Sequence, residues 1–229
     1  KIPVSKDLDS YMTFGMYPKI VSTESREEKM LLIKELTGDY LFKDLFMFGD
    51  IRNSFAFERL IKLLALRIGS EISYSELAKE VGISRDTVLN YITLLEQAFI
   101  IFRLTPFYTN KTKEINKSHK IYFYDIGIRN NLINITDPME LRPDKGAIFE
   151  NFFIAEKVKE REYAGRTGEI HFWKNRGGSE IDFVEVSDGK TKAFECKWKE
   201  IVRAPKVWSE TYKESSFECI TTENIIDHF

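Results

Sequence analysis

Several features that define protein classes are scarce or missing in this chain of 229 residues. It contains two cysteines, Cys196 and Cys219, in strand-like contexts that predict neither a disulfide framework nor a zinc site. No apolar run approaches the ~18 residues that a membrane-spanning helix needs, and residues 1–10 lack the apolar core of a signal peptide. We therefore expect a cytoplasmic protein with no membrane partner.

An excess of charge of one sign is also missing, because 34 basic residues nearly balance 36 acidic ones and leave a net charge of −2. This balance excludes a strong uniform attraction to nucleic acid, so any contact with DNA must be local. The pattern G-x-x-x-x-G-K-[ST], which binds nucleotide phosphates, does not occur, so no ATP site is expected here. The chain starts at Lys1 rather than at methionine, which suggests a fragment.

The length exceeds that of a usual single domain, and we expect two compact units plus an appendage. Residues 22–36 are expected to form a helix that Ser22 caps, and residues 53–68 a second helix that ends at Gly69. The first 52 residues are rich in aromatic side chains, which we expect in a core or in an interface to a missing part of the protein. Their exposure would predict homo-oligomers. These aromatics are Tyr11, Phe14, Tyr17, Phe42, Phe46 and Phe48.

Residues 74–96 have the pattern of a helix-turn-helix. Gly82 breaks the first helix and Ser84 caps the second. The apolar seam between them consists of Leu77, Ala78, Val81, Val88, Ile92 and Leu95. Two strand-like segments, 99–105 and 120–124, follow, and the loop between them carries Lys111, Lys113, Lys117 and Lys120. Together these elements predict a winged helix over residues 53–125 with a basic wing.

The predicted recognition helix has no cation on its outward face, which consists of Asp86, Asn90, Thr93 and Gln97. Helices that read the major groove usually add phosphate-positioning Lys or Arg, so direct readout by this helix is expected to be weak. The better DNA contacts are Arg85, Lys111, Lys113 and Lys117. A winged helix that packs against protein instead of DNA is the alternative.

The rest of the chain predicts a connector and then a mixed α/β unit. Residues 126–145, with Pro138 and Pro143, are expected to be the connector. An apolar helix over residues 147–161 opens the unit from 146 to 229. The expected strands are 169–174, 180–186, 191–198 and 217–221, with a helix at 205–213 before the last.

Asp188-Gly189 between two of these strands predicts a two-residue type I′ turn, which fixes the register of the strands beside it. Counting outward from the turn places Asp182 opposite Glu195, with Lys197 on the same face. Two opposed carboxylates repel unless they share a positively charged partner, and a hard divalent cation with oxygen ligands would serve as that partner. The competing interpretation is a solvated charged face on which Lys197 pairs with Glu180.

Glu150 is a further candidate, because it lies on the apolar helix beside Phe153 and Ile154. Glu150, Asp182 and the pattern Glu195-Cys196-Lys197 resemble the helix acid, strand Asp and strand Glu-x-Lys of the PD-(D/E)xK nuclease superfamily. The Pro that often precedes the Asp is replaced by Ile181. Nearly the whole chain is similar to the carboxyl-terminal region of a group of prokaryotic AAA-type ATPases. The supporting stretches are Phe14–Val21, the predicted winged helix, Lys120–Ile128 and Phe172–Phe183.

The resemblance implies a restriction-endonuclease-like α/β domain with a mixed sheet over residues 146–229. Residues 1–52 would then be a remnant of, or interface to, an upstream ATPase domain that alone holds ATP. The resemblance also implies that Asp182, Glu195 and Glu150 bind Mg²⁺ or Mn²⁺ and that Lys197 completes the catalytic set. An inactive module that binds DNA or a protein partner through the winged helix remains the alternative.

Overall fold

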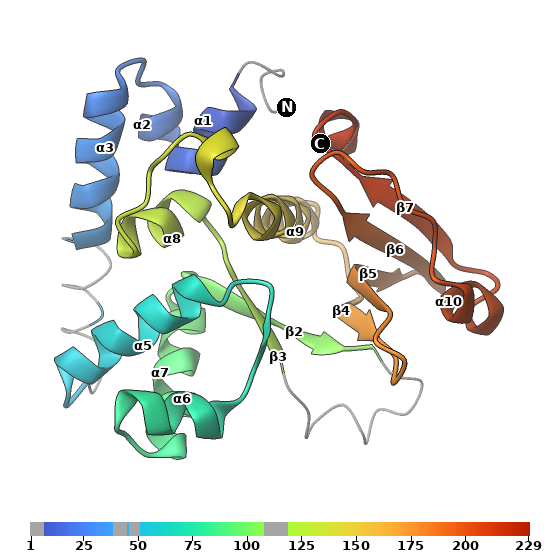
Figure 1. Ribbon diagram of the computed structural model, residues 1–229, viewed down its shortest axis with the longest axis horizontal. Coiled ribbons are helices and arrows are strands. Elements are labelled where there is room, and N and C mark those ends of the chain that lie inside the picture. The colour runs from blue at the N-terminus through green and yellow to red at the C-terminus, as the bar shows by residue number, and fades with distance from the viewer. Residues whose placement is uncertain (1–6, 39–44, 46–50, 108–118) are drawn as a thin grey trace.

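The computed structural model describes residues 7–38, 45, 51–107 and 119–229 (Figure 1). It opens with helices α1 (Leu8–Phe14), α2 (Pro18–Val21) and α3 (Arg26–Glu35). Ser25 rather than Ser22 caps α3, because the chain from Pro18 first forms the separate helix α2, which ends at Ser22. Tyr11 and Phe14 are buried in the core. Phe42, Phe46 and Phe48 lie outside the described residues.

The helices and strands expected between residues 53 and 125 all form. Gly82 adopts a left-handed conformation (φ +80°) that ends the first helix of the pair, and Ser84 accepts the Thr87 N–H to cap the second. The seam residues from Leu77 to Leu95 are buried as predicted. The elements are α5 (Ser54–Leu66), β1 (Glu71–Ile72), α6 (Tyr74–Val81), α7 (Arg85–Gln97), β2 (Ile101–Pro106) and β3 (His119–Phe123).

One mixed sheet of seven strands runs through both halves of the chain, in the order β1-β3-β2-β4-β5-β6-β7. Its remaining strands are β4 (Glu169–Lys174), β5 (Glu180–Ser187), β6 (Lys190–Cys196) and β7 (Ser216–Ile220). The junction is a short parallel pairing of β2 with β4, where Thr105 lies opposite His171. The expected units 53–125 and 146–229 therefore share a sheet rather than lying side by side as separate cores.

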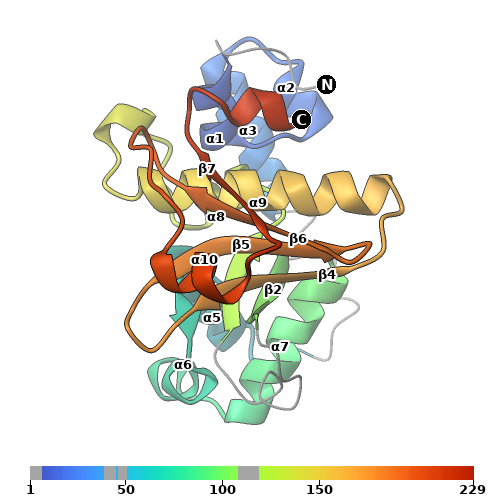
Figure 2. The same cartoon turned by 90° about the vertical axis from the view of Figure 1, so that its right-hand side faces the viewer.

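The carboxyl-terminal strands are covered on both faces (Figure 2). Helix α9 (Lys145–Tyr163) packs Phe149 and Phe153 into the main core with Phe183 and Phe194. Helix α10 (Lys206–Thr211) instead contributes Trp208 to a second cluster with Trp173, Ile181, Val184 and Ala193. A 3-10 helix, η4 (Ile225–His228), follows β7. Within the described residues, no helix has the length and apolar composition to cross a membrane.

The segment expected as a connector contains a buried helix, α8 (Ile126–Leu132), and a 3-10 turn, η3 (Met139–Leu141). Asp125 caps α8 by accepting the N–H groups of Gly127 (2.9 Å) and Ile128 (3.2 Å), and also accepts the N–H of Met16 (2.7 Å). Gly127 lies so close to α1 that an added Cβ would be 2.0 Å from the carbonyl oxygen of Phe14. This contact joins the amino-terminal helices to the rest of the protein.

Replacing Gly127 by alanine should therefore lower the free energy of unfolding by about 2 kcal/mol or more, the usual scale for overpacking. Gly146→Ala is the matched control, because Gly146 lies in α9 with nothing within 4 Å of an added Cβ. Alanine there should leave stability unchanged or raise it by up to about 1 kcal/mol. Urea denaturation of both variants measures the difference, and similar losses in the two would contradict the close contact.

Candidate active site

The hairpin of β5 and β6 has the register that the two-residue turn predicts. Asp188 (φ +51°) and Gly189 (φ +70°) both adopt the positive φ of a type I′ turn. Ser187 pairs with Lys190, and the pairing continues in step to Phe183 opposite Phe194. The Cys196 N–H then donates to Asp182 Oδ2 at 2.9 Å. The hairpin thus brings Asp182 beside Glu195.

A β-bulge next to the hairpin sets the direction of Asp182. Between β4 and β5, His171 pairs with Val184 and Trp173 with Ile181, so three steps along β5 match two steps along β4. Ile181 and Val184 consequently share the face under α10, whereas Phe183 packs on the α9 side. Asp182, inside the bulge, is 93% buried and directs Oδ1 to within 3.8 Å of Lys120 Nζ.

Lys120 of β3 lies at the centre of the acidic cluster, although the sequence placed it in an exposed basic wing. Its side chain is only 3% exposed. Its Nζ lies 3.4 Å from Glu150 Oε1, forms an ion pair with Glu180 Oε1 and approaches Asp182. Burial alone would lower the pKa of Lys120, but the charges of Glu150, Asp182 and Glu180 outweigh burial and raise its pKa.

Glu150 projects from α9 into this cluster. Its Oε1 accepts a hydrogen bond from the Tyr122 hydroxyl at 2.6 Å and one from Lys120 at 3.4 Å. Burial, followed by the charge of Asp182, raises the pKa of Glu150 to about 8 against the opposing effects of Lys120 and Tyr122. Glu150 is thus held by two neighbours on β3.

Glu195 and Lys197 form the outer edge of the site. Lys197 Nζ donates to Glu195 Oε1 at 2.7 Å, and the Lys197 side chain is 39% exposed. Within the described part of the chain, Glu195 Oε2 is buried and makes no hydrogen bond of normal geometry, although the Asp182 backbone N–H lies near the Glu195 carboxyl. Burial and the charge of Asp182 raise the pKa of Glu195. Glu180 pairs with Lys120 and approaches Lys174 at 3.8 Å, so the cross-strand pair of Lys197 with Glu180 is not the one that forms.

These residues can be compared with the needs of a divalent cation. The described residues contain no group of three or more His, Cys, Asp or Glu side chains arranged to hold a metal. Mg²⁺, however, keeps several waters and is commonly held by one or two carboxylates plus phosphate oxygens. Asp182 and Glu195, with its unpartnered Oε2, fit one such ion, whereas Glu150 is engaged by Lys120 and Tyr122.

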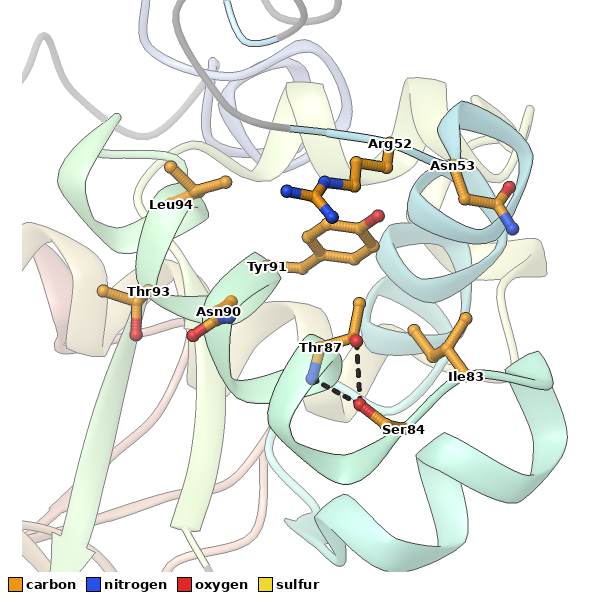
Figure 3. A pocket seen from close by; sticks show the side chains of 9 residues that line it. All are labelled: Arg52, Asn53, Ile83, Ser84, Thr87, Asn90, Tyr91, Thr93 and Leu94. Atoms are coloured by element: carbon orange, nitrogen blue, oxygen red, sulfur yellow. Dashed lines mark hydrogen bonds between the residues drawn. The ribbon is translucent and has the colours of Figure 1, made fainter.

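Of the candidate DNA contacts, Arg85 lies within the described residues. Arg85 is exposed at the start of α7, with its guanidinium 6.0 Å from the centre of the Tyr74 ring. The outward face of α7, from Asp86 to Gln97, is exposed as expected. A groove of about 730 Å³ lies between α7 and the start of α5, and in Figure 3 Arg52 points toward Tyr91 across it. Lys111, Lys113 and Lys117 lie outside the described residues.

The sequence interpretation missed Lys120 and Tyr122 as members of the site. Alternation along β3 puts both side chains on one face of the sheet, where each contacts Glu150. The available signal was a lysine two positions before a tyrosine in a strongly apolar strand, since a buried cation requires an acidic partner.

Two family models, both of unknown function, match parts of this chain. Residues 5–139 match the family described as Domain of unknown function (DUF8612), and the chain belongs to that family. Residues 145–219, which contain the candidate site except Lys120 and Tyr122, match a second one, described as Domain of unknown function (DUF4143).

Uncharacterized protein Rv2008c of Mycobacterium tuberculosis is 27% identical over 186 residues, which cover 80% of this chain and 41% of the relative. Uncharacterized protein MJ1544 of Methanocaldococcus jannaschii is 27% identical over 247 residues, which cover 98% of this chain and 53% of the relative. The chain thus spans about half the length of these curated relatives. The match to the crystal structure of protein VC1899 from Vibrio cholerae covers 93% of this chain and 50% of that protein's chain, at 12% identity. Its TM-score of 0.25 is too low to define the fold.

Substituting Glu195 by glutamine tests the acidic pair. Because burial and Asp182 both disfavour the charged form, Glu195→Gln should leave the stability of the metal-free protein unchanged or slightly higher. Mn²⁺ at a hundred times its Kd should stabilise the wild type by about 2.7 kcal/mol and the variant much less. Thermal melts with and without Mn²⁺ measure both effects. Glu200→Gln, an exposed neighbour, is the control, and equal Mn²⁺ shifts in all three proteins would exclude the site.

Proposed function

We propose that this chain carries a metal-dependent phosphodiesterase that hydrolyses nucleic acid at Asp182, Glu195 and Lys197, in a PD-(D/E)xK nuclease-like domain over residues 146–229. The observation that carries the proposal is the unpartnered, buried Glu195 Oε2 beside Asp182, with Lys197 bound to the other oxygen of Glu195. A buried carboxylate oxygen without a partner is costly, and a bound cation removes that cost.

In this proposal, Asp182 and Glu195 would hold Mg²⁺, which would polarise the scissile phosphate and lower the pKa of a bound water. Asp182 keeps its orientation through the Cys196 N–H. Lys197, which is partly exposed, orients the attacking water or offsets the charge that develops on the phosphate oxygens. The attacking water releases a proton to solvent as its oxygen bonds to phosphorus, the P–O ester bond breaks, and the departing alkoxide takes a proton from solvent. Glu150 serves as a positioning residue through Tyr122 and Lys120.

We further propose that residues 53–125 act as a winged helix that positions the substrate. The order of three helices and three strands, with β3 between β1 and β2, supports this assignment. Arg85, Lys111, Lys113 and Lys117 are the proposed phosphate contacts. The remaining half of the longer relatives would hold an AAA-type ATPase domain upstream, as the family resemblance suggests.

A second candidate is a catalytically inactive coupling module that transmits binding at the winged helix to a partner. The parallel pairing of β2 with β4 favours this module, because a movement of the winged helix would move the carboxyl-terminal strands with it. Metal-dependent cleavage by the purified chain separates the two candidates.

Replacing Lys197 by methionine should lower kcat for Mn²⁺-dependent cleavage of DNA about 100-fold, the effect typical for loss of one transition-state donor. Lys192→Met on the same strand is the control, because Lys192 is exposed and lies opposite Glu185 rather than in the cluster. Its cleavage rate should stay at the wild-type value. A fluorescent-substrate assay measures both, and a wild type that binds metal without cleaving DNA would favour the coupling module.

Replacing Lys111, Lys113 and Lys117 together by glutamate should weaken DNA binding and lower the slope of log Kd against log salt by about 3, since up to three phosphate contacts are lost. Asn90→Ala on the exposed face of α7 should change affinity less, because that face carries no cation. Fluorescence anisotropy at several salt concentrations gives both numbers. An unchanged slope in the triple variant would move DNA binding elsewhere.

A further inference from the structure

The position of Lys120 limits how many divalent cations the acidic cluster can take. Its ammonium group lies among three carboxylates from two elements, Glu150 of α9 and Glu180 and Asp182 of β5. A lysine that is 97% buried is rare unless it is paired, and here the pairing is threefold. We propose that Lys120 is a built-in cation that fills the position beside Glu150, so that the site binds one divalent ion, between Asp182 and Glu195.

The backbone holds Lys120 in this place from both sides. It lies on β3, opposite Glu71 of β1 and Leu104 of β2. Its Nζ also lies 5.4 Å from the centre of the Phe172 ring, which closes the cluster on another side. Lys120 is therefore a fixed part of the sheet, in contrast to Lys174, which meets the same Glu180 with 42% of its side chain exposed.

Electrostatics then argue against a second ion at Glu150. A divalent cation bound to Glu150 would lie close to the Lys120 ammonium, which is 3.4 Å from Glu150 Oε1, the oxygen that the Tyr122 hydroxyl also contacts. Two positive groups about 4 Å apart in a poorly solvated place repel by several kcal/mol. Glu150 is thus a positioning residue that contacts Lys120, and the ion contacts Asp182 and Glu195.

This inference deepens the proposed function, and the closing experiment separates the two. Calorimetric titration with Mn²⁺ measures stoichiometry and affinity for the wild type, Lys120→Met and the matched control Lys174→Met. We expect one ion per chain in the wild type and in Lys174→Met. Lys120→Met should bind a second ion or bind the first at least tenfold more tightly, because its acids lose their resident cation. A lysine with a purely structural role would change the melting temperature without changing either quantity.

Glu150→Gln keeps the inference testable if Lys120→Met does not fold. With Glu150 outside the coordination sphere, this variant should bind one ion within about threefold of the wild-type affinity, whereas Glu195→Gln should lose binding. A tenfold or greater loss in Glu150→Gln, two ions in the wild type, or unchanged binding in a folded Lys120→Met would each overturn the inference. Metal binding by Lys120→Met but not by the wild type would also overturn the inference, because the wild type is expected to bind one ion, and it would reject the nuclease as well. A wild type that binds one ion without cleaving DNA would reject the nuclease alone.

Discussion

The ammonium group of Lys120 is the charge on which the acidic site depends. Glu150, Glu180 and Asp182 would repel one another in a buried place without a shared cation. Removing one partner from a buried ion pair typically costs about 3 to 5 kcal/mol, since the remaining charge is left uncompensated. The lysine therefore explains how these three acids stay together in the absence of metal, whereas the ion expected from the sequence was to be shared by Asp182 and Glu195.

Because of Lys120, the site contains residues from both halves of the chain. It comes from the strand pair that belongs with α5, α6 and α7, whereas its partners come from α9 and β5. The parallel pairing of β2 with β4 brings these parts into one sheet. A shift of β3 relative to α9 would move Lys120 and Tyr122 together against Glu150.

Local signals in the sequence predicted most of the helices and strands and the hairpin, but not α8 or the cap of α3, because caps, left-handed glycines and a two-residue turn act over only a few residues. Ser84, Gly82 and the Asp188-Gly189 turn behave as expected. Contacts between distant segments were beyond this reasoning. The Asp125–Met16 hydrogen bond follows from no short pattern, and the spacing of Lys120 and Tyr122 signals burial without naming the acids that Lys120 meets. The bulge at Asp182 depends on pairing with β4.

Two different reasons account for the residue types in the stretches that carry the family resemblance, namely folding and function. Asp125 and Gly127 join α8 to α1, and Tyr122 holds Glu150, so folding alone accounts for those residue types. Glu195 is different, because its buried Oε2 lacks a partner in the described structure and contributes no packing that glutamine could not supply. A locally unfavourable group is expected where function requires it. The buried Oε2 of Glu195 is therefore the feature of the acidic cluster that folding explains least.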